Sequence, residues 1–427
     1  MTFKILTLGC KVNTYESNVI KDSLINNGYI EADKDADIYI INTCTVTNTA
    51  DNKSMKLIRR TIKENPNSIV VVCGCMVQNK RESIDGVDIM IGNVGKSKIS
   101  EYIDEYIKTK DKKMDIYDMM DVTFEPMILN NFDKTRAFVK IQDGCNNFCS
   151  YCVIPYVRGD VRSKPKEDVL NEINNLVLNG HKEIVLTGIH TGNYGVEFEN
   201  YDFASLLSDI VKIEGLERLR ISSIEVTELN DRVLDMIKNN NILVDHMHIP
   251  LQSGSDSVLK RMNRKYDKEY FINKIDEIRK IRPSISITTD VIVGFPGETL
   301  DEFNETIDTI KRVNFSKLHV FPYSKRDGTK ACCLPNHIDD VTKKERAKIL
   351  IDLSKVLENN YMDKFINKKV IFIPEIEKDG YIIGHTSNYL KIKCKGCRSD
   401  IGNDIEVLIV ENNYPVLLAE KIKDTNF

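Results

Sequence analysis

Short apolar runs alternate with amphipathic segments over residues 3–94. Runs of this length, bounded by polar and turn residues, indicate buried strands, and the segments between them have helical character. Alternation of strand and helix predicts a parallel sheet covered by helices. The expected strands are Phe3–Leu8, Asp37–Ile41, Ile69–Cys73 and Val87–Ile91, and the expected helices lie around Glu16–Asn27 and Asp51–Glu64.

A second alternating series follows residues 108–136, where the pattern dissolves into Lys, Asp and Met and predicts a linker. Six strand and helix units suggest an open partial (β/α)6 barrel, whose active site would lie at the carboxyl ends of the strands. Its helices include Lys166–Leu178 and Asp267–Ile281. Its strands are expected near Ala137–Ile141, Glu183–Leu186, Arg218–Ser222, His246–Pro250, Ser286–Val293 and Lys317–Phe321.

The last part of the chain changes texture after a long helix expected over Val341–Phe365. Short strands separated by turn residues predict a small all-β barrel. The chain is therefore expected to be an α/β protein with three domains, at residues 1–125, 131–365 and 366–427. The strands of the last domain are expected at Lys369–Ile376, Tyr381–Thr386, Tyr389–Lys393, Glu406–Glu411 and Val416–Lys421.

The composition of the chain indicates where the protein is located and what its cysteines do. The 427 residues are 41% hydrophobic and 29% charged, and the net charge of -4 gives no bulk sign of nucleic-acid binding. Met1–Leu8 lacks the features of a cleavable signal, and the longest apolar run, Ile69–Val77, is about half a membrane span. We therefore expect a cytoplasmic protein with no membrane partner. There, eleven cysteines indicate metal ligands or catalytic thiols rather than disulfides.

Three of these cysteines lie in one loop just past the first barrel strand, at Cys145, Cys149 and Cys152. A tight loop can cap three corners of a [4Fe–4S] cubane with thiolates and leave the fourth iron open to chelate a substrate. The alternative is a structural zinc site, which needs four ligands. The nearest downstream histidine, His181, is too distant for the usual spacing.

Three more cysteines are dispersed over the first domain, and each follows a predicted strand. Cys10, Cys44 and Cys75 would emerge together at the carboxyl edge of one parallel sheet, where ligands of such folds collect. They could cap a second cluster with an open corner. The alternative is that they only fill the core, as Cys73 is expected to do within its strand.

With these motifs the chain resembles the methylthiotransferase family of radical S-adenosylmethionine (SAM) enzymes, in particular the branch that modifies threonylcarbamoyladenosine in tRNA. The resemblance covers nearly the whole chain and is carried by the runs 8–17 (LGCKVNTYES), 41–51 (INTCTVTNTAD) and 73–75 (CGC). It implies that Cys10, Cys44 and Cys75 hold an auxiliary [4Fe–4S] cluster, and that Cys145, Cys149 and Cys152 hold the cluster that binds SAM. The terminal barrel is similar to the family's RNA-binding TRAM domain.

The activity that this resemblance implies is conversion of N6-threonylcarbamoyladenosine at tRNA position 37 to its 2-methylthio derivative. SAM cleavage at the first cluster would generate a radical that removes hydrogen from carbon 2, and the auxiliary cluster would deliver sulfur. The implied partners are the tRNA anticodon loop and an electron donor such as flavodoxin or ferredoxin. The alternatives are action on isopentenyl-adenosine tRNA or a ribosomal protein, and a non-catalytic, metal-stabilised RNA-binding protein.

Further candidates lie at the ends of barrel strands, where barrel chemistry gathers. By the resemblance, SAM contacts would come from Gly188, Ser222, Glu225, Gln252, Arg264 and Asp290. The alternative for each is helix capping or a structural hydrogen bond. Residues 134–166 hold seven Lys or Arg and two acids, and could position RNA phosphates or form a solvated loop.

Three other motifs are given no such role. Gly95-Lys96-Ser97 imitates a phosphate-binding loop, but Met90 stands where that loop needs glycine. For the pairs Cys394/Cys397 and Cys332/Cys333 we prefer a hairpin turn and ordinary packing over a third metal or redox site.

Overall fold

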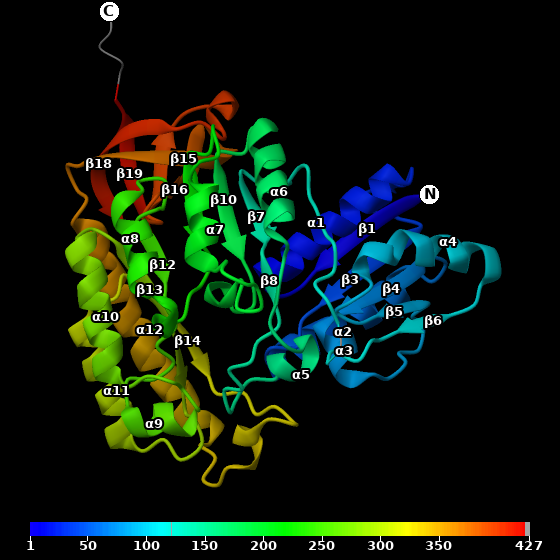
Figure 1. Cartoon of the computed structure of the whole chain (residues 1–427), viewed down its shortest axis with the longest axis horizontal. Helices are drawn as coiled ribbons and strands as arrows, with labels where there is room; N and C mark the ends of the chain where they lie inside the picture. The colour runs from blue at the N-terminus through cyan, green and yellow to red at the C-terminus, as the bar shows by residue number, and fades with distance from the viewer. Residues whose placement is uncertain (121, 423–427) are drawn as a thin grey trace, which may run out of the picture.

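The computed structural model describes residues 1–120 and 122–422, and its first part is a sheet of six parallel strands in the order β2-β1-β3-β4-β5-β6 (Figure 1). The predicted parallel sheet is confirmed, and β2 and β6 are short edge strands that the apolar pattern does not reveal. The strands are β1 (Thr2–Thr7), β2 (Ile30–Glu31), β3 (Ile38–Thr43), β4 (Ile69–Gly74), β5 (Ile89–Ile91) and β6 (Lys113–Asp115). The helices are α1 (Lys11–Asn26), α2 (Asn48–Glu64), α3 (Cys75–Lys80), the 3-10 turn η1 (Lys96–Lys98) and α4 (Ile99–Thr109).

The central part consists of two three-stranded parallel sheets, β11-β10-β7 and β12-β13-β14. A parallel bridge between Leu219 and Leu243 joins the sheets, so that six strands surround one interior as the sequence predicts. The strands are β7 (Arg136–Lys140), β10 (Glu183–Thr187), β11 (Arg218–Ile221), β12 (His246–His248), β13 (Ser286–Val293) and β14 (Lys317–Pro322), and β8 (Gln142–Asp143) and β9 (Arg162–Ser163) form a separate antiparallel pair.

Helices cover the outside of this open barrel (Figure 1). Several of them begin at side-chain caps such as Thr299 before α11, whose hydroxyl accepts from the Glu302 backbone N–H at 3.2 Å. The helices are α5 (Ile154–Arg158), α6 (Lys166–Leu178), α7 (Phe203–Ile210), α8 (Asp231–Asn239), α9 (Asp256–Arg261), α10 (Lys268–Ile281), α11 (Leu300–Val313) and α12 (Asp340–Asp363), with 3-10 turns η2 (Thr191–Asn193), η3 (Val226–Glu228) and η4 (Lys330–Cys333). None of the helices in residues 1–120 and 122–422 has the length and apolarity needed to cross a membrane.

The segment predicted as a linker is packed into the structure over much of its length. Met127, Leu129 and Phe132 are buried in the core of the central barrel. The Tyr15 hydroxyl of α1 donates to the Met127 carbonyl at 2.8 Å. The sequence pattern misses this packing because single apolar residues spaced by polar ones have neither helical nor strand periodicity.

The last five strands form a closed barrel in the order β15-β16-β17-β19-β18, as predicted. It lies against the amino ends of the central strands: Arg136 pairs with Glu375 at 3.2 Å, and Arg218 pairs with Asp404 at 2.6 Å. The carboxyl ends stay available for the site. The strands are β15 (Lys369–Lys378), β16 (Tyr381–Thr386), β17 (Lys391–Lys395), β18 (Ile405–Asn413) and β19 (Val416–Lys421), with the 3-10 turn η5 (Arg398–Asp400).

Candidate functional site

The dispersed cysteines meet at the carboxyl edge of the N-terminal sheet. Cys10 precedes α1 after β1, Cys44 directly follows β3, and Cys75 directly follows β4, and these three strands are neighbours in the sheet. Gly9 lets the first loop approach the second, because a Cβ at Gly9 would lie 3.0 Å from the Cys44 Cβ. With its φ of +113°, Gly9 also adopts a conformation that other residues rarely adopt. The parallel-sheet topology therefore brings together three thiols that are far apart in sequence.

These thiols are free and influence one another electrostatically. Burial raises the pKa of Cys44 to about 11, and the nearby Cys75 and Cys10 thiols add to that rise. Surrounding protein likewise raises the pKa of Cys10, which Arg158 opposes and Cys75 reinforces. Thiols in such surroundings need added positive charge, from a metal or from cationic side chains, to become thiolates at neutral pH.

The second trio lies in the loop between β8 and α5. Gly144 opens this loop with a φ of +75°, and a Cβ there would lie 1.8 Å from the Asp160 carbonyl oxygen, so no larger residue fits. Ser150 anchors the loop to the central barrel, since its N–H donates to the Met262 carbonyl at 3.0 Å. Burial raises the pKa of Cys152 to about 12, and the Cys149 and Cys145 thiols contribute to this shift.

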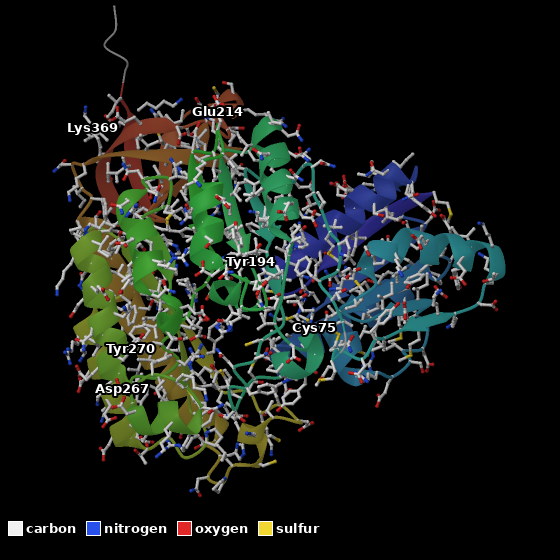
Figure 2. All side chains as sticks on the ribbon, viewed as in Figure 1. Cys75, Tyr194, Glu214, Asp267, Tyr270 and Lys369 are labelled. Atoms are coloured by element: carbon white, nitrogen blue, oxygen red, sulfur yellow. The ribbon has the colours of Figure 1, made fainter. Side chains whose placement is uncertain are left out.

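Helix α5 connects the two trios. It begins two residues after Cys152, and its Val157, with Val153 just before it, packs against Cys75. Figure 2 labels Cys75 close to α5. Asn93 fixes this contact: its Oδ1 lies 3.5 Å from the Cys75 Sγ, and its Nδ2 donates to the Val157 carbonyl at 2.7 Å. The cysteines from the two parts of the chain therefore lie on either side of one helical turn.

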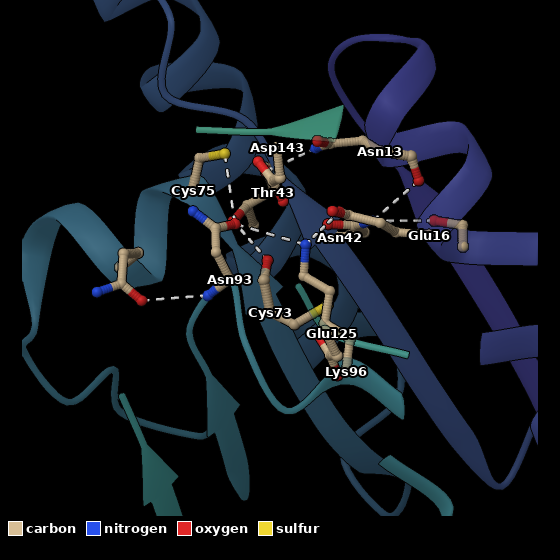
Figure 3. Close-up of polar contacts among 12 residues, drawn as sticks. Asn13, Glu16, Asn42, Thr43, Cys73, Cys75, Asn93, Lys96, Glu125 and Asp143 are labelled. Carbon is tan, nitrogen blue, oxygen red and sulfur yellow. Dashed lines mark hydrogen bonds and ion pairs between the residues drawn. The ribbon is translucent and has the colours of Figure 1, made fainter. Parts of the chain in front are cut away.

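A buried ion network lies directly behind the first trio (Figure 3). Glu16 of α1 is fully buried and pairs with Lys96, with Lys140 at 2.8 Å and with Arg158 at 3.0 Å. Arg158 also pairs with Asp143 at 3.0 Å. Burial alone would raise the pKa of Glu16, but Arg158, Lys140 and Lys96 hold it well below its usual value.

The network carries more positive than negative charge. Arg162, 3.8 Å from Asp143, adds a fourth cation, so four cations face the two carboxylates of Glu16 and Asp143. The Nε atoms of Arg158 and Arg162 are buried and have no hydrogen-bond partner among the described residues. Buried charge needs compensation, and thiolates at Cys10 and Cys75 would supply it.

The donor set fits an iron–sulfur cluster in each trio. Within residues 1–120 and 122–422, no three or more Cys, His, Asp or Glu side chains are gathered around a common single-ion position. The thiolates of a cubane bind separate iron corners and need no such convergence. Three sulfur donors and excess positive charge suit an anionic, thiolate-capped cluster.

A cavity of about 920 Å³ opens beside Cys10 and lies in the interior of the central barrel. Cys10 and Lys11 line it from the N-terminal part, and Tyr389 lines it from the C-terminal barrel. Inside, His248 lies 3.3 Å from the Asp290 carboxylate. All three parts of the chain thus contribute to one chamber, and its volume suits a nucleoside-sized ligand.

Comparisons with known proteins agree with this geometry. Residues 139–310 match the radical SAM superfamily, and residues 2–92 match the uncharacterized protein family UPF0004. The threonylcarbamoyladenosine tRNA methylthiotransferase MtaB of Bacillus subtilis is 44% identical over 422 residues, which cover 96% of this chain and 94% of that protein. The chain belongs to the radical SAM methylthiotransferase family. It is an enzyme that transfers a sulfur-containing group, with SAM and [4Fe–4S] clusters as cofactors.

Other relatives carry a different substrate in their names. The tRNA-2-methylthio-N(6)-dimethylallyladenosine synthase of Lachnoclostridium phytofermentans is 35% identical over 439 residues, which cover 99% of this chain and 96% of that protein. The radical SAM methyltransferase TsrM of Kitasatospora setae has a TM-score of 0.55 at 13% identity, with 75% of this chain and 72% of that chain covered. The TsrM likeness shows the fold alone.

The six residues expected to contact SAM separate into two groups in this methylthiotransferase. Gly188, Ser222 and Asp290 line the cavity together with Cys10. Asp290 lies within β13, which corrects its expected place at a strand end. Glu225 and Arg264 form an ion pair with each other, and Arg264 Nη1 lies 3.4 Å from the Cys149 Sγ.

Two of these residues contribute in ways that their sequence positions do not reveal. The carboxylate that Arg264 meets in this structure is that of Glu225. Gln252 acts through its backbone, since its N–H donates to the Asp290 carbonyl at 2.8 Å and extends the sheet beside β13. None of the six contacts with SAM is established by this arrangement, and all six stay predictions.

The expected basic RNA-binding patch at residues 134–166 is wrong for four of its seven cations. Lys140, Arg158, Arg162 and Lys164 are buried. The first three belong to the network behind Cys10, and Lys164 pairs with Glu172 at 2.5 Å. Charges inside the protein cannot reach RNA phosphates. The sequence does not reveal their burial, because it depends on the packing of Glu16, 142 residues from Arg158, against these cations.

The Gly-Lys-Ser run and the two other cysteine pairs lie outside the candidate site. Lys96 of the Gly-Lys-Ser run is fully buried beside Glu16, which agrees with rejecting a phosphate-binding loop. Cys394 is buried in the last barrel, whereas Cys397 is exposed and its sulfur caps the turn η5. The cysteines at 332 and 333 lie in η4 as free thiols.

Several functional residues were not evident from sequence. Glu16 and Asn93 support the first trio, and His190 Nδ1 lies 3.8 Å from the Cys145 Sγ. Burial would lower the pKa of His190, but Cys145 and Glu228 raise it to about 10. The one signal for Glu16 was its place six residues after Cys10, inside a motif that we assigned to the cysteine alone.

Proposed function

We propose that this enzyme converts N6-threonylcarbamoyladenosine at tRNA position 37 to its 2-methylthio derivative, with one [4Fe–4S] cluster in each trio. The observation that carries the proposal is the packing of Cys75 against α5, the helix that follows the second trio, with Cys10 in the wall of one chamber. The 44% sequence identity to the Bacillus subtilis threonylcarbamoyladenosine tRNA methylthiotransferase supports the choice of substrate.

Cys145, Cys149 and Cys152 would hold the cluster that binds SAM, and Cys10, Cys44 and Cys75 would hold the auxiliary cluster. When bound, these groups supply one-electron cleavage of SAM and the sulfur to be transferred, chemistry that protein side chains lack. The chain itself orients these groups. α5 and Asn93 fix the distance between the trios, and Arg158 places fixed positive charge beside Cys10 and Cys75.

SAM would occupy the carboxyl ends of the barrel strands, in contact with Gly188, Ser222, Gln252 and Asp290, while the pair Glu225/Arg264 orients the loop of Cys149. Carbon 2 of the adenine would then lie between this site and Cys10. Burial in the chamber excludes water and competing hydrogen donors from that position.

The substrate base must leave its stack to enter the chamber, which costs least in a single-stranded loop, so we propose the anticodon loop as the docking element. The exposed aromatic side chain of Phe321, which lines the chamber, suits stacking on an unpaired base. We further propose a cytoplasmic enzyme with no membrane partner, reduced by a flavodoxin or ferredoxin. The three domain boundaries given above are part of this proposal.

The proposal is tested by mass spectrometry of tRNA nucleosides from cells with and without the gene. We expect the 2-methylthio derivative of threonylcarbamoyladenosine to disappear on deletion and its precursor to accumulate. Loss of the methylthio derivative of isopentenyl-adenosine instead would establish the tRNA alternative. Unchanged nucleosides would point to a ribosomal protein as substrate or to a non-catalytic RNA-binding role.

Iron content is the second expected outcome. Because each trio would bind a four-iron cluster, anaerobic reconstitution should give about eight iron atoms per chain. Replacing Cys145, Cys149 and Cys152 together with alanine should leave about four, and replacing exposed Cys333 should leave about eight. A chain that binds a single cluster with all eleven cysteines present would refute the assignment of two.

A further inference from the structure

Two residues of the chamber wall carry buried nitrogen atoms that no described residue satisfies. Arg220 is buried and lines the chamber, and its Nε pairs with Glu183 at 2.7 Å while its Nη2 has no partner among residues 1–120 and 122–422. The Nδ1 of buried His246, on the same wall, also lacks a partner there. Tyr389 holds Arg220 in place, with the guanidinium carbon 4.8 Å from its ring centroid.

Lys11 brings a further cation to the same chamber. It is half-buried and lines the chamber together with Arg220. Lys11 forms no ion pair within 4.0 Å with any residue that the structure describes, and the carboxylate of Asp290, on the same wall, attracts it from farther away. Among the described residues, two acids line the chamber: Glu358 pairs with Lys317 at 2.8 Å, and Asp290 lies 3.3 Å from His248. Four cations line it, Lys11, Arg220, Lys317 and Lys391, of which Arg220 pairs with Glu183.

This imbalance calls for an anion from outside the chain, because like charges converge there only if a ligand compensates them. A carboxylate is the best match for a lysine and a guanidinium edge with a free N–H. Lys11 also directly follows Cys10, a member of the first trio. An anionic group bound at Lys11 could therefore belong to the same adenine whose carbon 2 is presented to that trio.

We propose that Lys11 and Arg220 bind the carboxylate of the threonylcarbamoyl group, and that this contact makes the enzyme select adenosines carrying that anion. The inference rests on the function proposed above. The threonylcarbamoyl group keeps the free carboxylate of threonine, whereas a dimethylallyl group is an uncharged hydrocarbon. A hydrocarbon would leave both cations uncompensated, and binding sites reject ligands that leave buried polar groups unpaired.

The test compares three anticodon stem-loop RNAs in equilibrium binding to the anaerobic holoenzyme. One carries threonylcarbamoyladenosine, one carries its carboxyl methyl ester, and one carries unmodified adenosine. The ester keeps the shape of the group and removes only its charge. Since a charged hydrogen bond is worth several-fold to a hundredfold in affinity, the natural protein should bind the acid about tenfold or more tightly than the ester.

Lys11→Met should lose most of the preference for the acid, because only Arg220 would remain to bind the carboxylate. It should keep the affinity of the natural protein for unmodified RNA, which also shows that the variant is folded. Lys11→Arg should restore the preference for the acid. Lys317→Met is the matched control, because Lys317 lines the same chamber but is already paired with Glu358, and it should keep the preference.

Two results would overturn the inference while the proposed function stands. Lys11→Met could retain the full preference for the acid, or it could lose the same factor for all three RNAs, which would make Lys11 a contact to the RNA backbone. Failure of the proposed function itself has a different signature: the natural protein would not separate acid from ester, and cellular threonylcarbamoyladenosine would carry no methylthio group.

Discussion

Replacing Cys149 with alanine is expected to reduce reductive SAM cleavage to background, a loss of more than about a thousandfold. Cys149 lies in the loop that presents three thiols, and two remaining thiols cannot hold a cubane with one open corner. Replacing Cys75 should leave SAM cleavage largely intact and stop methylthiolation, because Cys75 belongs to the other trio. Both activities can be measured in one anaerobic assay, from 5′-deoxyadenosine and from modified RNA.

The two variants test separate roles for the trios. Cys73→Ala is the matched control for Cys75→Ala, since Cys73 lies two residues away in the core of β4 and belongs to neither trio. It should retain both activities, apart from a modest loss of stability. Equal loss of both activities in Cys75→Ala would contradict the division of labour.

Replacing Arg158 with methionine should destabilise the enzyme by about 3 kcal/mol or more, because it breaks two buried, hydrogen-bonded ion pairs. Glu16 and Asp143 each lose a hydrogen-bonded cation within 3.0 Å. The same change removes positive charge beside Cys10 and Cys75, so the variant should also lose iron from the auxiliary site. Chemical denaturation followed by circular dichroism and iron analysis measure the two effects.

Arg60→Met is the control for this change. Arg60 pairs with Glu64 at 2.9 Å on the surface of α2, where its side chain is 69% exposed. Exposed pairs contribute little, so the expected loss is below about 0.5 kcal/mol, with no change in iron. If Arg158→Met kept the stability and iron content of the natural protein, the buried network would have no role in holding the auxiliary site.

The sequence predicted the fold well wherever apolar periodicity was strong. The central strands β3 and β4 are buried along their whole length and appear in the sequence as continuous Ile and Val runs. The edge strand β6 was not predicted, because its Lys113 and Asp115 are only partly buried. Edge strands with one neighbour need not be apolar, so they lack the pattern.

The grouping of Cys10, Cys44 and Cys75 could be predicted because parallel topology alone sends strand ends to one edge. The partners of Arg158 could not, since Glu16 is 142 residues away in the chain and only the packing of α1 against the barrel brings them together. The same limit made buried cations look like an RNA-binding surface. The domain boundaries and the individual SAM contacts stay predictions.

The central claim is that two clusters lie close together at the strand tips, on either side of α5. Electron paramagnetic resonance of the reduced, reconstituted holoenzyme tests it most directly, because two nearby paramagnets broaden and relax each other. We predict mutual broadening in the natural protein and simple, isolated spectra in Cys75→Ala and Cys149→Ala. Two clusters that relax independently in the natural protein would contradict the account.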